Sequence, residues 1–266
     1  MEITMKKIQL SLIAILMSMS QFVWAQITEV KLHYVGATEG SAWLGVQQGL
    51  AEANIQGEFL GQKYTLETVS ATDLQKLDAV MAILVAGDAK QVLTIAKQFN
   101  HVPVFNLASD SDDLRSACLD NVLNVGVSQR MKQDAQAQMN NKRSVSKAIA
   151  QGWHKDFRKF SASQLNGRFT KAQGQAMTDN AWAGWAAVKM LSDTVARSQI
   201  TQAEEMLRYL KNDLAFDGQK GAGATFRDTG QLRQLVLLIE NNKIVAEAPL
   251  RGVKGGLDSL GLVSCK

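Results

Sequence analysis

The chain has 266 residues, of which 46% are hydrophobic and 20% charged, with 20 Gly and only 2 Pro. This composition excludes a disordered, collagen-like or disulfide-dense protein, and the length allows one large domain or two small ones. The formal net charge is only +4 and the basic residues are scattered, so the sequence indicates no nucleic-acid-binding surface. A basic patch formed only by folding stays open.

The first 25 residues have the three parts of a secretory signal peptide. Lys6 and Lys7 precede an apolar run from Ile8 to about Ala25, and the run ends in a small residue. A membrane anchor is the alternative, but the uninterrupted apolar stretch is short for about 30 Å of hydrocarbon. We therefore expect residues 1–25 to be a signal peptide that is cleaved after Ala25.

The two cysteines, Cys118 and Cys265, both lie in the part of the chain predicted to be exported. An oxidising compartment allows a disulfide to persist, and a bridge would tie the C-terminus to the middle of the chain. We expect this bridge, with two unpaired thiols as the alternative. Two cysteines without clustered histidines cannot form a structural zinc site.

Between residues 30 and 127 the pattern of apolar residues predicts strands that alternate with helices. Residues 30–34 alternate as in a half-buried strand, whereas residues 79–86 are continuously apolar, as in a parallel strand buried on both faces. Further strands are expected at 64–69, 102–107 and 122–127, with one helix from Ser41 to a stop at Gly57 and another capped by Asp88. Short connections between these elements predict an α/β fold, with a parallel sheet and helices on both faces.

Three of these strands end in turns that lead into helices, at residues 36–42, 86–88 and 107–110. In a parallel sheet these ends share one edge, where backbone N–H groups and helix dipoles favour an anion such as a carboxylate. This edge offers hydroxyl donors at Thr38, Ser41 and Ser109, and carboxylates for an ammonium group at Asp88 and Asp110. The alternative is that Ser41, Asp88 and Asp110 only cap helices.

The second half of the chain is less regular. Residues 128–151 are strongly polar and predict an exposed helix or connector without core residues. Thr178 or Asp179 caps a later helix, in which we expect Trp182 and Trp185 to pack in the core. A capping box at 201–204 opens another helix, and strands at 232–240 and 243–248 are joined by Asn241-Asn242 in a hairpin turn.

No catalytic or metal-binding motif is found in the sequence. It has no Gly-x-Ser-x-Gly elbow, no Walker phosphate loop and no Gly-x-Gly-x-x-Gly segment. The three histidines, His33, His101 and His154, are far apart and fit no local metal-ligand spacing. A pair of carboxylates that meets only in the folded chain stays open. We expect a protein that is not an enzyme and that holds no cofactor and no metal.

Several short segments, taken in order, resemble one protein family. They are 34–37 (Tyr-Val-Gly-Ala), 49–54 (Gly-Leu-Ala-Glu-Ala-Asn), 60–64 (Leu-Gly-Gln-Lys-Tyr), 102–106 (Val-Pro-Val-Phe-Asn), the helix at 182–189 and the glycine-phenylalanine turn at 216–231. Their order is similar to that of type I periplasmic substrate-binding proteins, the Leu/Ile/Val-binding-like components of ABC transporters. Residues 106–115 with Cys118, and residues 231–234 with Cys265, resemble a subgroup that accompanies PQQ-dependent alcohol dehydrogenase systems in bacteria.

The resemblance implies a parallel-sheet sandwich of the periplasmic-binding-protein type I kind, in which a second lobe is inserted into the first. In this sequence, only a polar stretch lies at the position where the second lobe would be inserted. We therefore expect essentially one lobe plus a C-terminal β-hairpin. Residues 26–130 would form the first part of the α/β lobe, 131–160 a polar connector in place of the second lobe, and 161–266 the return segment with the C-terminal strands.

The resemblance also implies a function, that of a periplasmic solute-binding component of an ABC importer for a small carboxylate-bearing ligand. The ligand residues expected from the first lobe are Thr38, Ser41, Ala86, Gly87, Asp88, Leu107, Ala108 and Ser109. With one wall missing, we expect weak or absent amino-acid binding by the monomer. The alternative is a non-transport module whose exposed surface docks a second copy or a periplasmic quinoprotein alcohol dehydrogenase.

Overall fold

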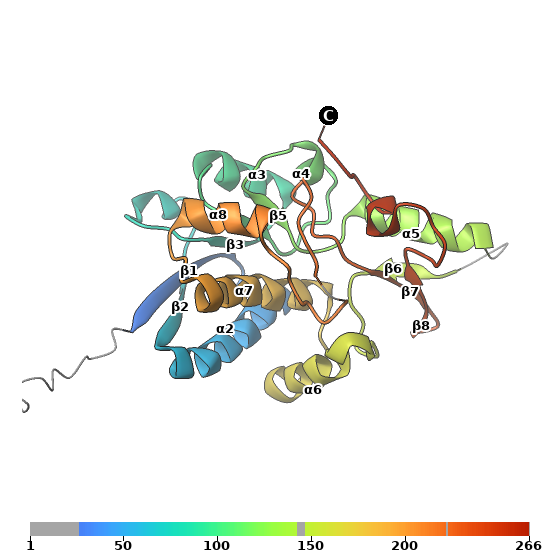
Figure 1. Cartoon of the computed structure of the whole chain (residues 1–266), viewed down its shortest axis with the longest axis horizontal. Coiled ribbons are helices and arrows are strands. Elements are labelled where there is room, and N and C mark those ends of the chain that lie inside the picture. The colour runs from blue at the N-terminus through green and yellow to red at the C-terminus, as the bar shows by residue number, and fades with distance from the viewer. Residues whose placement is uncertain (1–26, 143–146, 222, 266) are drawn as a thin grey trace, which may run out of the picture.

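The computed structural model of the chain describes residues 27–142, 147–221 and 223–265. The predicted signal peptide and its cleavage site lie outside these ranges. Within them the strands form two sheets, one of five strands and one of three (Figure 1). No helix in the described ranges has the length and apolar content needed to cross a bilayer.

The five-stranded sheet confirms the predicted α/β fold. Its strands are β1 (Thr28–Gly36), β2 (Gln62–Thr68), β3 (Ile83–Ala86), β4 (Val104–Asn106) and β5 (Val122–Asn124). They lie in the order β2-β1-β3-β4-β5, and all four neighbouring pairs are parallel. Strand β3 is shorter than the apolar run at 79–86 predicted, because its pairing with β1 begins only at Ile83, opposite His33.

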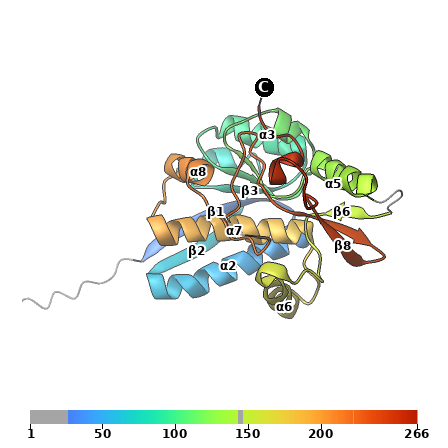
Figure 2. The same ribbon diagram turned by 45° about the vertical axis from the view of Figure 1, so that its right-hand side comes forward.

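Helices cover both faces of this sheet, as the sequence predicted (Figures 1 and 2). Helices α2 (Ser41–Leu60), α6 (Ala162–Gln173), α7 (Asp179–Ser198) and α8 (Ala203–Asn212) share one apolar core with the sheet. Helices α3 (Ala89–Gln98) and α4 (Asp113–Ser116) contribute to a second core on the other face. In the described ranges, short 3-10 helices lie at Leu74–Lys76, Lys159–Ser161 and Gly256–Ser259. Trp182 and Trp185 are buried in the first core, as expected.

Helices α2 and α7 approach each other unusually closely because glycines line their contact. A Cβ atom added at Gly45 would lie 1.9 Å from the carbonyl oxygen of Ala181, and one at Gly184 would lie 2.4 Å from that of Ala42. The predicted stop at Gly57 is wrong for a related reason. Gly57 is buried inside α2, where a Cβ would lie 2.3 Å from the carbonyl oxygen of Gln62, and the helix ends instead at Gly61, with φ 65°.

A small antiparallel sheet forms the second unit. Its strands are β6 (Ile149–Gln151), β7 (Val236–Glu240) and β8 (Lys243–Ala248), in the order β6-β7-β8. Helix α5 (Gln129–Lys142) packs against it. The expectation that residues 128–151 contribute no core residues is therefore wrong. Met131, Ala135 and Met139 are buried at a spacing of four residues, and this narrow stripe is hidden in an otherwise polar helix.

The C-terminal segment shows the predicted hairpin and disulfide. Asn241 and Asn242 have φ angles of 50° and 57° between β7 and β8, as a two-residue hairpin turn requires. Cys118 and Cys265 form a disulfide, which excludes the alternative of two free thiols. The predicted strand at 232–240 is shortened to β7, because Leu232 makes only an isolated bridge with Phe226.

Candidate functional site

A cleft of about 730 Å³ lies between the carboxyl edge of the five-stranded sheet and the small sheet. One wall comes from the turn after β4, the start of α2 and the start of α7. The facing wall comes from β6, the segment that follows it, Lys132 of α5 and Asn242 of the hairpin. The residues that line it are Ser41, Leu107, Ala108, Ser109, Asp110, Gly126, Val127, Lys132, Ile149, Ala150, Gln151, Trp153, His154, Lys155, Ala176, Met177, Thr178, Asp179, Asn180 and Asn242.

The structure brings together half of the residues that the sequence predicted as ligand contacts. Four of the eight line the cleft: Ser41, Leu107, Ala108 and Ser109. The other four, Thr38, Ala86, Gly87 and Asp88, do not border it. Asp88 caps α3 by accepting a hydrogen bond from the backbone N–H of Gln91 at 2.8 Å, so its predicted capping role is confirmed. Whether any of the eight binds a ligand stays a prediction.

The backbone N–H groups after β4 are not free to bind a carboxylate. The buried side-chain oxygen of Asn106 accepts hydrogen bonds from Ala108 N–H at 3.3 Å and Ser109 N–H at 3.0 Å. The side-chain amide of Asn106 donates to the carbonyl oxygen of Ser109 at 2.7 Å. The turn therefore offers the cleft side-chain groups, chiefly the Ser109 hydroxyl, rather than backbone donors.

The N-terminus of α2 is the better anion-binding element. Its N-cap residue is Gly40, no side chain caps it, and its first turn contains no acidic residue. The first N–H groups of a helix have no partner within the helix, and they carry the positive end of its dipole. Ser41, which the sequence proposed as the cap, is instead the first residue of the helix and lines the cleft.

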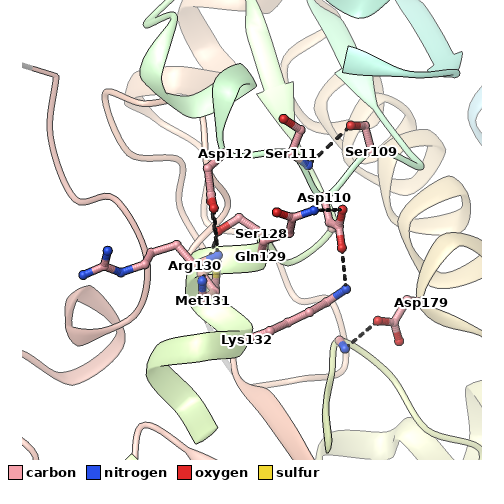
Figure 3. Close-up of polar contacts among 12 residues, drawn as sticks. Ser109, Asp110, Ser111, Asp112, Ser128, Gln129, Arg130, Met131, Lys132 and Asp179 are labelled. Atoms are coloured by element: carbon pink, nitrogen blue, oxygen red, sulfur yellow. Dashed lines mark hydrogen bonds and ion pairs between the residues drawn. The ribbon is translucent and has the colours of Figure 1, made fainter. Parts of the chain in front are cut away.

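The turn after β4 fixes the start of α5 (Figure 3). The Asp112 carboxylate accepts a hydrogen bond from Arg130 N–H at 3.0 Å, and Asp110 accepts one from the Lys132 ammonium at 2.9 Å. Burial raises the pKa of Asp110, but the hydrogen bond and charge of Lys132 outweigh this and hold that pKa below its usual range. Asp110 is thus matched by Lys132 and is not available as a free acceptor for an ammonium group.

A second carboxylate, that of Asp179, also joins the two walls of the cleft. Asp179, at the first position of α7, accepts hydrogen bonds from the N–H groups of Gly152 and Trp153, each at 2.7 Å. Thr178 caps the helix, as predicted, by accepting from Ala181 N–H. Within the described ranges Asp179 makes no ion pair, although its charge favours the protonated form of the buried Lys220 and so raises the pKa of that group against the effect of burial. The sequence suggested Asp179 only as an alternative cap and missed this position in the cleft.

His154 and Asn242 complete the facing wall. The His154 Nδ1 accepts a hydrogen bond from Asp156 N–H at 3.2 Å, so the ring proton lies on Nε2, which donates to the Asn242 side-chain oxygen at 3.2 Å. Lys155, beside them, pairs with Asp156 at 2.8 Å. In the described part of the chain, no group of three or more His, Cys, Asp or Glu side chains is placed to hold a metal ion.

Solved structures with a similar fold include ligand-binding and substrate-binding proteins. A branched-chain amino acid ABC transporter periplasmic ligand-binding protein from Burkholderia xenovorans has a TM-score of 0.69 and 13% identity, over 86% of this chain and 96% of that one. An ABC transporter substrate-binding protein from Desulfitobacterium hafniense has a TM-score of 0.69 and 12% identity, over 82% of this chain and 98% of that one. The chain has the fold of type I periplasmic binding proteins.

A leucine-binding protein from Thermotoga maritima has the same fold, with a TM-score of 0.63 and 12% identity over 82% of this chain and 98% of that one. No protein-family model matches the chain, and no curated protein matches it. At these identities the similarity shows the fold alone. What this chain binds must therefore be argued from its own cleft.

Proposed function

We propose that this protein is a periplasmic solute-binding component of an ABC importer, exported by residues 1–25 with cleavage after Ala25. Its ligand would be a small molecule with a carboxylate and an ammonium group, such as a branched-chain amino acid, and it would bind in the cleft without chemical change. The observation that carries this proposal is the placement of two opposite electrostatic features on one cleft. These are the uncapped start of α2 and the carboxylate of Asp179, which makes no ion pair in the described ranges.

The carboxylate of the ligand would bind at the start of α2. The positive end of this helix dipole and its free N–H groups favour an anion, and the Ser41 hydroxyl adds a donor. The Ser109 hydroxyl lines the same cleft. These donors are neutral and supply no full positive charge. They therefore suit a ligand whose carboxylate is balanced by an ammonium group in the same molecule.

The ammonium group would bind at Asp179. Both of its oxygens already accept one backbone hydrogen bond each, which fixes the orientation of the carboxylate. The carboxylate makes no ion pair in the described ranges, and its interaction with the buried Lys220 is one of charge without a direct contact. A carboxylate oxygen has a second lone pair, so each can accept one more hydrogen bond. Asp110 does not serve this purpose because Lys132 neutralises it.

We expect weak binding because the cleft remains open. We propose that residues 131–160 stand in place of a second lobe. In the described part of this range, the facing wall draws on helix α5 and strand β6 and not on a further α/β layer. Hydrogen bonds that stay wet contribute little net affinity. We expect a Kd of roughly 0.1–1 mM for leucine, isoleucine or valine.

Isothermal calorimetry with these amino acids tests the proposal. Asp179→Asn should weaken binding about tenfold or more, because the ammonium loses its charged partner. Asp217→Asn is the matched control, since Asp217 also accepts a backbone hydrogen bond, from Gln219 N–H at 3.0 Å, but lies outside the cleft. Equal affinities for the wild type and Asp179→Asn would contradict the proposed site. No binding of any amino acid or small carboxylate would contradict the proposed function.

A second candidate function rests on an exposed apolar cluster near the C-terminal end of α2. It consists of Ile27, Ile55, Phe59 and Leu60, and the Phe59 side chain is 85% exposed. Such a cluster favours a non-transport module that docks a second copy, or a partner such as a periplasmic quinoprotein alcohol dehydrogenase. Sedimentation without ligand tests it. A dimer that Phe59→Asp dissociates would favour this function, and a monomer at all concentrations would oppose the homodimer.

A further inference from the structure

The positive charge of this protein is concentrated on one short segment. Residues 153–173 contain five Lys and Arg residues and one acidic residue, an excess of four charges that equals the formal net charge of the whole chain, +4. The rest of the chain is therefore electrically balanced. The five basic residues are Lys155, Arg158, Lys159, Arg168 and Lys171, and all are exposed.

Two of these cations make no ion pair in the described ranges. Three make ion pairs with carboxylates: Lys155 with Asp156, Lys159 with Glu247 and Arg168 with Glu52. Arg158 and Lys171 make no ion pair or side-chain hydrogen bond in the described part of the chain. Both remain available for an external anion.

Arg158 and Lys171 line the same open groove, of about 710 Å³, between residues 155–158 and the outer face of α6. The hydroxyls of Ser163 and Thr170 line it too. Gly167 lies between them, and a Cβ added there would meet nothing within 4 Å. The Asp156 carboxylate lines the groove as well, and it is paired with Lys155 at 2.8 Å. The groove thus combines two cations that make no ion pair in the described ranges with two hydroxyl donors, which is the chemistry that binds phosphate oxygens.

An exposed aromatic ring stands beside this groove. The Phe160 ring is 49% exposed and lies 6.3 Å from the ring of Phe157, which lines the groove. Phe160 and Ser161 have φ angles of 54° and 65°, and a positive φ is unfavourable for a bulky side chain such as that of Phe160. Two consecutive residues in this conformation suggest a function for the ring they display, because such backbone strain clusters at functional sites.

We propose that this surface docks the protein onto a membrane containing anionic phospholipids. The α6 basic surface, as we name it, consists of Lys155, Arg158, Phe160, Ser163, Thr170 and Lys171. Headgroup phosphates bind in the groove and Phe160 enters the interface between headgroups and acyl chains. The pairing of basic residues with an exposed aromatic ring favours a membrane, since a free phosphate or an acidic protein would need no such ring. Helix α6 lies at the periphery of the molecule, where a flat surface can reach it (Figures 1 and 2).

Vesicle co-sedimentation tests the proposal, with protein purified from the periplasm after export and its N-terminus read by mass spectrometry. One set of vesicles contains phosphatidylcholine alone, and the other contains about one third phosphatidylglycerol. We expect binding only to the second set, and less of it as salt is added. Arg158→Gln with Lys171→Gln should weaken binding about 25-fold, roughly fivefold for each cation. Phe160→Ala should weaken binding about fivefold, because about half of the ring is exposed in the free protein and can become buried in the membrane interface.

The matched control is Lys90→Gln with Lys97→Gln. These exposed lysines on α3 also lack an ion pair in the described ranges, and α3 lies on the opposite side of the molecule from α6 (Figures 1 and 2). This double variant removes the same charge and should keep binding within about twofold. If both double variants weaken binding equally, the effect is general charge and the proposal is wrong.

Three further results would overturn it. The first is equal binding to both sets of vesicles. The second is a thermal shift with inorganic phosphate, lost in the Arg158 and Lys171 variant, but no vesicle binding, which would make the groove a site for soluble anions. The third is binding to polyglutamate that matches vesicle binding and does not depend on Phe160, which would favour an acidic protein as the partner.

Discussion

Replacing Gly45 with alanine should separate the two helices that carry the cleft. The added Cβ would lie 1.9 Å from the carbonyl oxygen of Ala181, 2.7 Å from its carbonyl carbon and 2.8 Å from its Cα. All three are backbone atoms of α7, so no side-chain rotation relieves the clash. Overpacking of this kind costs about 3 kcal/mol or more, and the better helix propensity of alanine returns up to about 1 kcal/mol. We expect a net loss of about 2–3 kcal/mol in the free energy of unfolding.

Gly167→Ala is the matched control for this substitution. Gly167 lies inside α6, and a Cβ there would have no atom within 4 Å. The same chemical change should therefore stabilise the protein by roughly 0.5–1 kcal/mol through helix propensity alone. The two glycine substitutions are thus predicted to shift stability in opposite directions.

Urea denaturation followed by tryptophan fluorescence measures both effects, because Trp182 and Trp185 are buried on α7. With a slope of about 2–3 kcal/mol per molar urea, Gly45→Ala should lower the midpoint by about 1 M. A Gly45→Ala midpoint within error of the wild type, or shifts of the same sign for Gly45→Ala and Gly167→Ala, would refute the reasoning from close helix contact.

Three further predictions concern stability. Reducing the disulfide, or replacing both Cys118 and Cys265 with serine, should lower the free energy of unfolding by up to about 5 kcal/mol in urea titrations, because the bridge closes a long loop in the unfolded chain. Burial lowers the pKa of Lys220 to about 7, whereas the unfolded chain keeps this proton to about pH 10. Stability should therefore rise between about pH 7 and 9, and Lys220→Met should remove about 2 kcal/mol of that rise; an unchanged slope would contradict this assignment. The buried Arg227 binds the carbonyl oxygens of Leu257 and Leu260 at 2.5 and 2.7 Å, so Arg227→Met should cost about 3 kcal/mol and expose residues 256–262 to proteases.

Structural features that depend on neighbouring residues in the chain were predicted well from the sequence. Asp88 and Thr178 cap their helices through side-chain oxygens, and Asn241-Asn242 form the hairpin turn. The alternation at 30–34 became β1 in the interior of the parallel sheet. In each case the residues that determine the conformation are close neighbours in the chain.

Predictions failed where a distant contact decided the outcome. Gly57 did not end α2, because it lies buried against the start of β2. One local prediction also failed, since α8 begins at Ala203 with Gln202 as its N-cap residue, and the expected capping box at Thr201 does not form. The sequence of α5 is mostly polar, so its buried apolar stripe was not predicted. That stripe packs against β7 and β8, which lie near the end of the chain.

The candidate site was predictable only on one wall. Ser41 and Ser109 follow from the rule that parallel strands end at one edge, and both line the cleft. Asp179 reaches it because β6 pairs with β7, which places Gly152 and Trp153 beside the start of α7. No sequence signal predicts that pairing. The role of Asn106, which occupies the N–H groups after β4, likewise depends on a side-chain orientation within the fold.

The ion pair and hydrogen bonds that connect the two walls of the cleft have a mechanical consequence. The Asp110–Lys132 ion pair and the Asp179 bonds to residues 152–153 each join one wall of the cleft to the other. A ligand would enter a cleft whose width is already fixed before binding. None of its binding energy would then be used to close the two walls around it. Small-angle scattering should then give one radius of gyration with or without solute, and any transporter that engages this protein would have to sense the solute itself rather than a change in shape.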